Sequence, residues 1–198
     1  MIKKLKYYFW RILPISLILN LKSGVQISDK ARILGWPIVE NRNGGSISIG
    51  KNVTLNSRNW GNALGVRGPI IIRTLAKTAK VEIGDNCGLS GTRIAAAHHI
   101  KIGNRVLIGA DSIIVDSNFH PINPTDRYKQ PRPASKPQDA VLIEDDVFIG
   151  AGCIILKGVT IGRGSVIGAH SVVSQSIPEM SIASGNPAKV VKQIVVDS

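Results

Sequence analysis

Residues 115–139, VDSNFHPINPTDRYKQPRPASKPQD, contain the side chains best suited to chemistry. His120 lies near the start of this segment, and a neutral histidine accepts a proton readily because its pKa lies near physiological pH. His120 is therefore a candidate general base. Asp116, four residues earlier, is predicted to orient the imidazole and to stabilise its charged form. The alternative for Asp116 is a turn residue that bonds to nearby backbone.

A six-residue repeat surrounds this segment and indicates what positions it. Aliphatic residues spaced six apart occur at Ile102, Ile108, Ile114, Ile143, Ile149, Ile155, Ile161, Ile167 and Val173. A second apolar position often lies two residues earlier, and residues i and i+2 of a strand face the same side. Glycine follows many of the aliphatic residues and permits a tight corner. A strand and a corner every six residues must wind into a coil, so the sequence predicts an all-β solenoid.

The repeat stops at Ile114 and resumes at Val141. The interval contains five of the ten prolines of the chain, which restrict the backbone and remove hydrogen-bond donors. We predict that residues 116–139 form an extruded active-site loop, because a smooth solenoid face has no concavity for two substrates. The predicted organisation is an N-terminal segment over residues 1–24, a repeat domain over 25–185 and a C-terminal tail over 186–198.

The net charge, aromatic content and cysteines of the chain indicate which classes of partner and compartment to expect. The net charge of +12 favours anionic partners such as a phosphate-bearing cofactor, a membrane leaflet or nucleic acid. A nucleic-acid binder would need aromatic platforms or groove-reading motifs, but only 5% of the residues are aromatic, so we expect no nucleic acid. Cys87 and Cys153 fall at interior positions of the repeat and are predicted to be buried thiols in a reducing, cytoplasmic compartment.

The first 24 residues, MIKKLKYYFWRILPISLILNLKSG, lie outside the repeat. Arg11 and Pro14 interrupt their apolar stretch, which is too short for a spanning helix. Five basic residues and no acidic residue would suit an anionic membrane leaflet. The other interpretation is a cap over the open edge of the first coil. The two interpretations are compatible, and the sequence predicts a cap, a peripheral contact with the inner face of the membrane, or both.

The remaining histidines were considered as metal ligands. A catalytic zinc site of this kind requires three histidines that converge on one ion. His98 and His99 are adjacent on a predicted strand and would point to opposite faces. Since no other histidine accompanies His120 in its loop, we expect no metal site, and His170 is not assigned a role.

Two longer segments resemble the hexapeptide-repeat acyltransferases. They are IKIGNRVLIGADSIIVDSNFHPINP and VLIEDDVFIGAGCIILKGVTIGRGSVIGAHSVVSQSIPEMSIASGNPAKVVK, and they are most similar to sugar O-acetyltransferases of the maltose, colanic acid and capsule or lipopolysaccharide type. The resemblance covers residues 25–192. It implies a left-handed parallel β-helix of triangular section, a homotrimer, acetyl-CoA as the acyl donor and a sugar hydroxyl as the acceptor.

The same resemblance implies which residues bind the substrates. The expected coenzyme A contacts are Phe148, Gly150, Gly168, Ala169, Ser174, Lys189 and Lys192. The loop residues Asn118 and Arg127 are expected to bind the acceptor. Phe148 occupies a position where the family often has tryptophan, and Ser174 begins the triplet SQS where the family often has Thr-Lys-Asp. The second difference removes a cation near the pantetheine.

The predicted function is therefore acetyl transfer from acetyl-CoA to a sugar hydroxyl in the biosynthesis of a surface polysaccharide. Two alternatives remain. A non-catalytic repeat scaffold at the membrane would use the loop for docking, and an N-acetyltransferase would act on an amino sugar. The extruded loop with His120 and the coenzyme-like C-terminal segment favour an enzyme over a scaffold.

Overall fold

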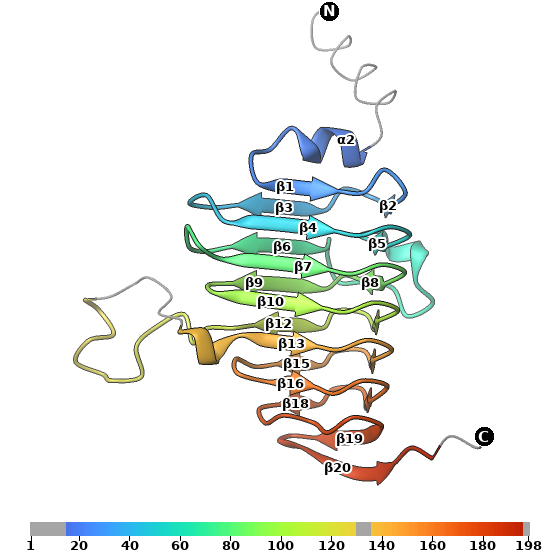
Figure 1. The fold of residues 1–198 in the computed structure, drawn as a ribbon, viewed down its shortest axis with the longest axis vertical. Helices are drawn as coiled ribbons and strands as arrows, with labels where there is room; N and C mark the ends of the chain where they lie inside the picture. Colours follow the sequence, from blue (N-terminus) through green and yellow to red (C-terminus); the bar gives the residue numbers. More distant parts are fainter. Residues whose placement is uncertain (1–14, 130–135, 196–198) are drawn as a thin grey trace, which may run out of the picture.

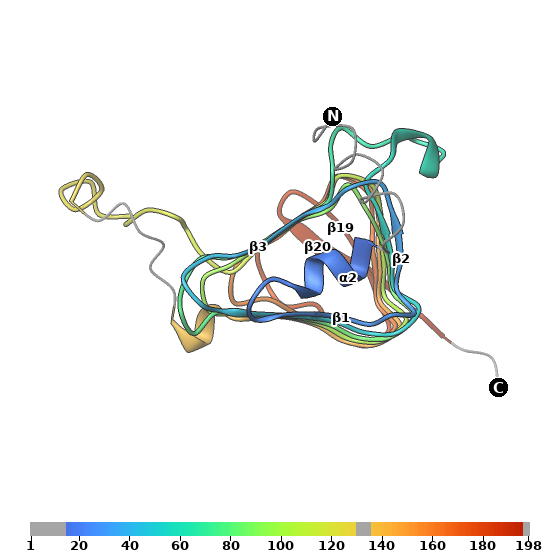
Figure 2. The ribbon, with the colours of Figure 1, turned by 90° about the horizontal axis from the view of Figure 1, so that it is seen from above.

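The protein forms a triangular, left-handed parallel β-helix. This computed structural model describes residues 15–129 and 136–195. Coils stack along the long axis of the molecule (Figure 1), and the view along that axis shows three flat sides (Figure 2). The all-β solenoid predicted from the six-residue repeat is confirmed.

Each side of the prism is one sheet, and successive coils add one strand to each sheet. Sheet A contains β1 (Val25–Ile27), β4 (Ser46–Ile49), β7 (Lys80–Ile83), β10 (His99–Ile102), β13 (Val141–Ile143) and β16 (Thr160–Ile161). Sheet B contains β2 (Arg32–Leu34), β5 (Thr54–Asn56), β8 (Gly88–Ser90), β11 (Leu107–Ile108), β14 (Phe148–Ile149), β17 (Val166–Ile167), β19 (Ser181–Gly185) and β20 (Ala188–Gln193). Sheet C contains β3 (Ile38–Asn41), β6 (Ile71–Thr74), β9 (Arg93–Ala96), β12 (Ile113–Val115), β15 (Ile154–Ile155) and β18 (Val172–Val173).

The repeated aliphatic residues form ladders inside the prism. Ile102 pairs in parallel with Ile143, and Ile143 pairs with Ile161. All three are almost completely buried, and burial of each such side chain stabilises the fold by roughly 2 kcal/mol. Cys87 and Cys153 are free and buried in the same core, as predicted, and burial raises the pKa of both thiols.

The outward sides of the three sheets differ in chemistry. Sheet A presents polar side chains such as Glu82 and Lys101. Sheet B presents Leu107 and Phe148, which are paired in adjacent strands and are 54% and 48% exposed. Sheet C presents a largely aliphatic column that includes Ile113. The two more apolar faces therefore meet at the corner between sheets B and C, called the B–C corner.

The ends of the prism are closed differently. Helix α2 (Ile15–Asn20) contacts β1 at the first coil, with Ile18 and Leu19 buried beneath it. Residues 1–14 lie outside the described residues, so the prediction of a cap or membrane contact over residues 1–24 stays a prediction. At the other end, β19 and β20 form an antiparallel pair. Within the described residues, no helix is both long enough and apolar enough to cross a membrane.

Two excursions leave the coils at opposite edges of sheet C. The first, called the roof loop, comprises residues 57–68 at the B–C corner and contains the 3-10 helix η1 (Asn59–Gly61). The second, called the histidine loop, comprises residues 116–139 at the corner between sheets C and A, the C–A corner, and ends in η2 (Pro137–Asp139). The histidine loop projects away from the prism in both ribbon views (Figures 1 and 2).

Candidate active site

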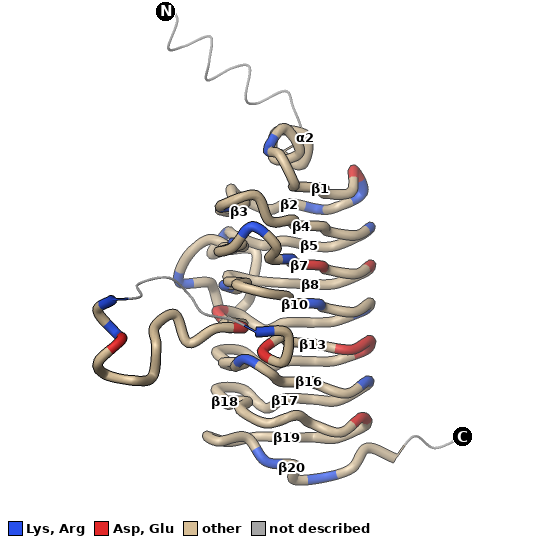
Figure 3. Tube along the Cα trace, turned by 60° about the vertical axis from the view of Figure 1, so that its left-hand side comes forward, with Lys and Arg blue, Asp and Glu red and all other residues tan. Residues whose placement is uncertain are grey.

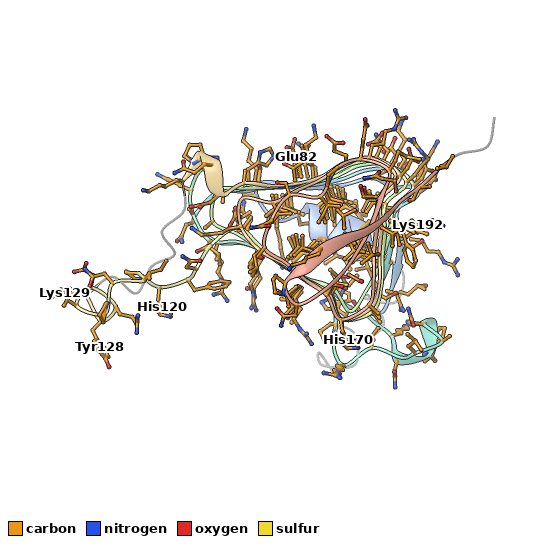
Figure 4. All side chains as sticks on the ribbon, turned by 90° about the horizontal axis from the view of Figure 1, so that it is seen from below. Glu82, His120, Tyr128, Lys129, His170 and Lys192 are labelled. Carbon is orange, nitrogen blue, oxygen red and sulfur yellow. The ribbon has the colours of Figure 1, made fainter. Side chains whose placement is uncertain are left out.

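His120 lies on the histidine loop, five residues after the end of β12. Its side chain is exposed, and its backbone N–H donates to the carbonyl of Asn118 at 2.7 Å. Figure 4 shows His120 on the projecting loop, away from the body of the prism. The predicted base is thus displayed on the surface of a single chain.

Asp116 is fully buried at the root of the histidine loop. One carboxylate oxygen accepts the backbone N–H of Ala97 at 2.6 Å, and the other accepts the N–H groups of His98 and His99, each at 2.7 Å. These bonds attach the loop root to the preceding coil. Asp116 therefore anchors the root of the histidine loop. Its predicted role in orienting His120 stays a prediction.

The far end of the histidine loop is anchored by Asp139. Its carboxylate accepts hydrogen bonds from the ammonium of Lys157 at 2.8 Å and from the backbone N–H of Lys136 at 2.9 Å. Burial alone would raise the pKa of Asp139, but these two donors outweigh burial and lower the pKa below its usual value. The loop is therefore held by a carboxylate at each end.

The two predicted acceptor residues lie on the exposed surface of this loop. Asn118 is exposed, and its carbonyl accepts the His120 N–H. The guanidinium of Arg127 donates to the carbonyls of Pro121 and Ile122 at 3.3 and 2.7 Å. Arg127 thus closes a turn within the loop, and the acceptor contacts assigned to both residues stay predictions.

Most of the predicted coenzyme residues lie on sheet B or at the B–C corner. A Cβ atom on Gly150 would lie 2.5 Å from the backbone nitrogen of Ala169, so the stacked corners need glycine there. Gly168 is next to Ser184 in the following coil, and Ser184 pairs with Lys189. The predicted residues on this continuous surface are Phe148, Gly150, Gly168, Ala169, Lys189 and Lys192.

Ser174 is the exception among the predicted coenzyme residues. It follows β18, so it lies at the C–A corner, on the same edge of sheet C as the histidine loop. Sheet C separates Ser174 from Gly168 and Ala169. A ligand that contacts both sets in one chain would have to cross the whole face of the sheet.

A groove of about 540 Å³ lies at the B–C corner, beside Gly150 and Ala169. We call it the corner groove, and its lining includes Arg67, Arg93, Asp111, Gly152 and His170. His170 stacks on Gly152, where a Cβ atom would lie 2.6 Å from the imidazole. The volume is in the range of small-ligand sites.

The roof loop closes one end of the corner groove and was missed by the sequence reasoning. The backbone N–H of Arg67 donates to both carboxylate oxygens of Asp111 at 3.0 and 3.2 Å, which folds the loop back onto the next coils. The available signal was the interval between Leu55 and Ile70, which is fifteen residues instead of six and is rich in glycine and asparagine.

His120 and the corner groove do not converge within one chain. They lie on opposite edges of sheet C, and Figure 4 shows His120 well apart from His170, which lines the groove. Each chain therefore presents two separate half-sites, one with the predicted base and one with the predicted coenzyme wall.

A larger groove of about 780 Å³ lies beside α2 and β1. Its lining comes from the first coils of sheet A and their corners, and it contains none of the predicted site residues. Size alone would favour this groove, but the predicted coenzyme residues Gly150 and Ala169 lie next to residues that line the corner groove.

The other histidines have individual environments. His99 pairs with Glu82 on the outer side of sheet A at 2.5 Å. The prediction placed His98 on a strand, whereas β10 begins at His99 and His98 lies in the corner before it. Among the described residues, no group of three or more histidine, cysteine or acidic side chains is arranged to hold a metal ion.

Comparisons with known proteins agree with this architecture. The family model for bacterial transferase hexapeptides (six repeats) matches residues 140–175, and the hexapeptide repeat of succinyl-transferase matches residues 99–117. The chain is 33% identical over 166 residues to the "Putative lipopolysaccharide biosynthesis O-acetyl transferase WbbJ" of Escherichia coli K12, covering 82% of this chain and 79% of that protein.

Two further relatives match over shorter segments. Galactoside O-acetyltransferase of Lactococcus lactis is 33% identical over 142 residues, which cover 61% of this chain and 66% of that enzyme. A 2,3,4,5-tetrahydropyridine-2,6-dicarboxylate N-acetyltransferase of Halalkalibacterium halodurans is 52% identical over 62 residues, which cover 31% of this chain. This match spans only 25% of the length of the N-acetyltransferase.

Solved structures share the fold. AntD, an N-acyltransferase from Bacillus cereus in complex with dTDP-4-amino-4,6-dideoxyglucose and coenzyme A, has a TM-score of 0.61 at 22% identity, covering 93% of this chain and 91% of that one. A maltose O-acetyltransferase from Clostridium difficile has a TM-score of 0.50 at 26% identity, covering 90% and 74%. With the repeated coils and the match to WbbJ over most of both chains, these findings confirm the resemblance: the chain belongs to the hexapeptide-repeat transferases, a family of acyltransferases.

Proposed function

We propose that this protein transfers an acetyl group from acetyl-CoA to a hydroxyl of a sugar in the biosynthesis of a surface polysaccharide. The observation that carries the proposal is the pair of half-sites at the two edges of sheet C, a displayed histidine and a corner groove beside stacked glycines. The names of the relatives, a lipopolysaccharide and a galactoside O-acetyltransferase, support the acceptor class.

The chemistry assigned to His120 is general-base catalysis. A neutral imidazole takes the proton of the sugar hydroxyl as the oxygen attacks the thioester carbonyl. The tetrahedral intermediate then collapses, the carbon–sulfur bond breaks, and the imidazolium returns its proton to the departing thiolate. The products are an acetyl ester and free coenzyme A. Asp116 would hold the imidazole in the required orientation, in addition to anchoring the loop root.

The coenzyme is placed along the B–C corner. Lys189 and Lys192 on β20 lie at the C-terminal end of this surface and would meet the phosphates of the nucleotide. Gly150, Gly168 and Ala169 would line the pantetheine, because their small side chains leave the corner backbone accessible. Phe148 would contribute an apolar surface beside it.

A trimer would bring the two kinds of half-site together. Rotation of one chain onto the next can place the C–A corner of one copy against the B–C corner of its neighbour. Three equivalent clefts would form, each with His120 and Ser174 from one chain and the coenzyme wall from the next. The position of Ser174 at the C–A corner, opposite Gly168 and Ala169, supports this arrangement.

Charge distribution supports a cytoplasmic enzyme at the inner face of the membrane. Residues 15–85 carry ten lysines and arginines and four acidic residues, a net charge of +6, whereas residues 136–195 carry five of each. Figure 3 shows this difference between the first and the last coils. An anionic leaflet would attract the N-terminal end of the prism, where Leu17 and Leu21 are 49% and 80% exposed.

The proposal is tested by thioester consumption. Purified protein is incubated with acetyl-CoA and a panel of neutral sugars, nucleotide sugars and lipid-linked glycans, and free thiol is measured. The expected product is an acetyl ester, which hydroxylamine cleaves. A hydroxylamine-stable amide would instead identify an N-acetyltransferase, and AntD is named an N-acyltransferase. Failure to bind acetyl-CoA and to consume it with any acceptor would leave the scaffold interpretation.

A further inference from the structure

The N-terminal end of the corner groove has features of a second anion site. We propose that Arg93 and Arg67 bind a phosphate or carboxylate group of the acceptor, so that the natural acceptor is an anionic sugar and not a neutral one. This inference rests on the proposed acetyl transfer, because it assigns the acceptor end of the same cleft. The roof loop is then the element that selects the acceptor.

Arg93 is a cation in an otherwise aliphatic column. On the outer side of sheet C it pairs with Ile71 in the preceding coil and Ile113 in the next. Its side chain is partly buried and reaches toward the roof loop, where its Nη2 atom lies 3.8 Å from the position that a Cβ of Gly68 would occupy. Within the described residues, the Arg93 guanidinium has no ion pair and no hydrogen bond.

A partly buried guanidinium without a partner is costly, because it loses hydration without gaining a charge-assisted hydrogen bond. An aliphatic side chain would fit the column better if packing were the only requirement. A planar fork of donors facing a groove suits a bidentate carboxylate or phosphate. Arg93 therefore has the chemistry of a ligand contact.

The roof loop fixes Arg67 at the same end of the groove. The carboxylate of Asp111 accepts hydrogen bonds from the backbone N–H of Arg67. The side-chain oxygen of Asn59 accepts a hydrogen bond from the backbone N–H of Val66, and this bond closes the loop on itself. Among the described lining residues, Asp111 is the only acidic one. Two guanidiniums against one carboxylate, with His170 nearby, leave the groove with an excess of positive charge.

The order of residues along the prism axis separates this site from the coenzyme phosphates. The corner residue Asp111 belongs to the same coil as β12 and the root of the histidine loop. Gly150 and Gly168 lie on the following coils, and Lys189 lies beyond them. Arg93 lies on β9, in the preceding coil.

A rotation about an axis parallel to the prism keeps every coil at its own level. His120 of the partner subunit would then reach the groove near the level of Asp111, between the coenzyme wall and Arg93. Cations at Lys189 and Lys192 would serve the coenzyme on one side of the base. Cations at Arg93 and Arg67 are left for an anionic acceptor on the other side.

The kinetic test compares matched acceptors. Wild type, Arg93→Gln and Arg67→Gln are assayed with nucleotide sugars, hexose 1-phosphates and hexuronates, each beside its neutral hexose or methyl glycoside. We expect kcat/KM to favour an anionic acceptor and to fall roughly 10- to 100-fold in Arg93→Gln, mainly through KM, as for the loss of a charge-assisted bond. The KM for acetyl-CoA and any transfer to neutral glycosides should be unchanged.

The control is Arg58→Gln, which removes a cation from the same loop outside the groove. The Arg58 guanidinium lies over the Trp60 ring at 5.1 Å from its centroid, so this variant should keep wild-type kinetics. Arg93→Lys should recover part of the loss, because it restores charge without the planar fork. A preference for phosphorylated acceptors would identify the bound group as a phosphate, and a preference for hexuronates would identify it as a carboxylate.

A binding measurement separates this inference from the proposed reaction. Calorimetric titration with pyrophosphate and, separately, glucuronate is carried out with saturating coenzyme A, which occupies the lysine end. Binding by wild type and Arg58→Gln that is lost in Arg93→Gln supports the subsite, even if no acetyl transfer is ever found. Unaltered anion binding in Arg93→Gln and Arg67→Gln, or equal kcat/KM for neutral and anionic acceptors, would overturn it while leaving acetyl transfer intact.

Discussion

The histidine loop and the roof loop leave the same prism at opposite edges of sheet C, but they behave differently. The roof loop folds back because Asp111 binds the N–H of Arg67, and it thereby closes a groove. Among its described residues, the histidine loop is fixed to the coils near its two ends, through Asp116 and Asp139, and its described part projects from the prism. The roof loop lines a groove that does not contain the predicted base, and the histidine loop carries the predicted base away from that groove.

Within one chain, the predicted base and most of the predicted coenzyme residues therefore lie at opposite edges of sheet C, so the proposed shared site would need a second copy. Anchoring by a carboxylate is common to both loops, so the anchors do not explain the difference. The contrast is that the described part of the histidine loop projects from the prism, whereas the roof loop lines a groove on it.

Replacement of His120 should have the largest effect. His120→Ala should lower turnover by roughly 10² to 10⁴, since this is the usual contribution of a general base. Acetyl-CoA binding, measured by calorimetry, should remain close to wild type because the coenzyme wall lies on the other edge of sheet C. Full activity in His120→Ala would remove the histidine loop from the mechanism.

Mixing two inactive proteins tests whether each active site combines His120 of one chain with the coenzyme surface of a neighbouring chain. His120→Ala is combined with Gly168→Trp, which blocks the coenzyme wall, and the subunits are allowed to exchange. If neighbouring chains share each site, random trimers should recover about a quarter of wild-type activity, because one site in four receives both intact halves. Each protein mixed with itself is the control. A site contained in one chain would recover nothing, and sedimentation as a monomer would contradict sharing directly.

The anchor at the root of the histidine loop is tested by Asp116→Asn. An amide can direct its NH2 group at the backbone N–H groups that the carboxylate accepts, so the free energy of unfolding should fall by about 1–3 kcal/mol in urea titrations. Asp126→Asn, in the exposed part of the loop, is the matched control. If Asp116 also orients His120, the pH profile of turnover should shift, whereas an unshifted profile would leave Asp116 as an anchor only.

Replacement of the two lysines at the C-terminal end of the proposed coenzyme surface should have a smaller effect. Replacing Lys189 and Lys192 with glutamine should raise the KM for acetyl-CoA roughly tenfold and reduce its salt dependence, because exposed cations contribute modestly to phosphate binding. Turnover should change little, since these contacts are distant from the reacting carbonyl. A truncated thioester without the nucleotide should be used equally well by both proteins. If that substrate also loses efficiency, the lysines act elsewhere.

The smallest effect concerns the second anchor of the histidine loop. Lys157→Gln should lower the free energy of unfolding by about 1 kcal/mol or less at neutral pH. Because the Lys157 and Lys136 contacts lower the folded pKa of Asp139, their contribution is present above the unfolded pKa. It should disappear as the pH falls below about 4. Denaturant titrations of both proteins should therefore converge in acid, and a constant difference would exclude this origin.

Much of the fold was predictable because the repeat is local and redundant. Each coil carries the same spacing of apolar residues, so an irregular coil does not obscure the pattern. The pairing of Ile102, Ile143 and Ile161 confirms the predicted ladder. The position of His120 after a regular coil was predictable for the same reason. The positions of Phe148 and Gly150 follow from the same spacing, whereas Lys189 lies on the antiparallel strand β20 outside the repeat, and the coenzyme contacts of all three stay predictions.

The remaining features depend on contacts between distant residues. Arg67 and Asp111 are 44 residues apart in the chain, so nothing near either residue indicates that the roof loop folds back to close a groove. Asp116 accepts the backbone N–H of Ala97, 19 residues away, whereas the sequence suggested an orienting role toward His120 or a bond to nearby turn backbone, and neither points to Ala97. The resemblance to the family placed Ser174 with Gly168 as a coenzyme residue, but six residues along this coil lead from one corner of the prism to the next.

The six-residue period was sufficient to predict the coil, its buried ladders and the place where the histidine loop leaves, because the period couples strand direction to burial at every turn. The corner that each residue occupies, and the loop that returns to the prism, became known from the folded chain. The physical reason is that corners stack residues from different coils, so a groove is formed by side chains and backbone donors that meet through stacking and not through sequence.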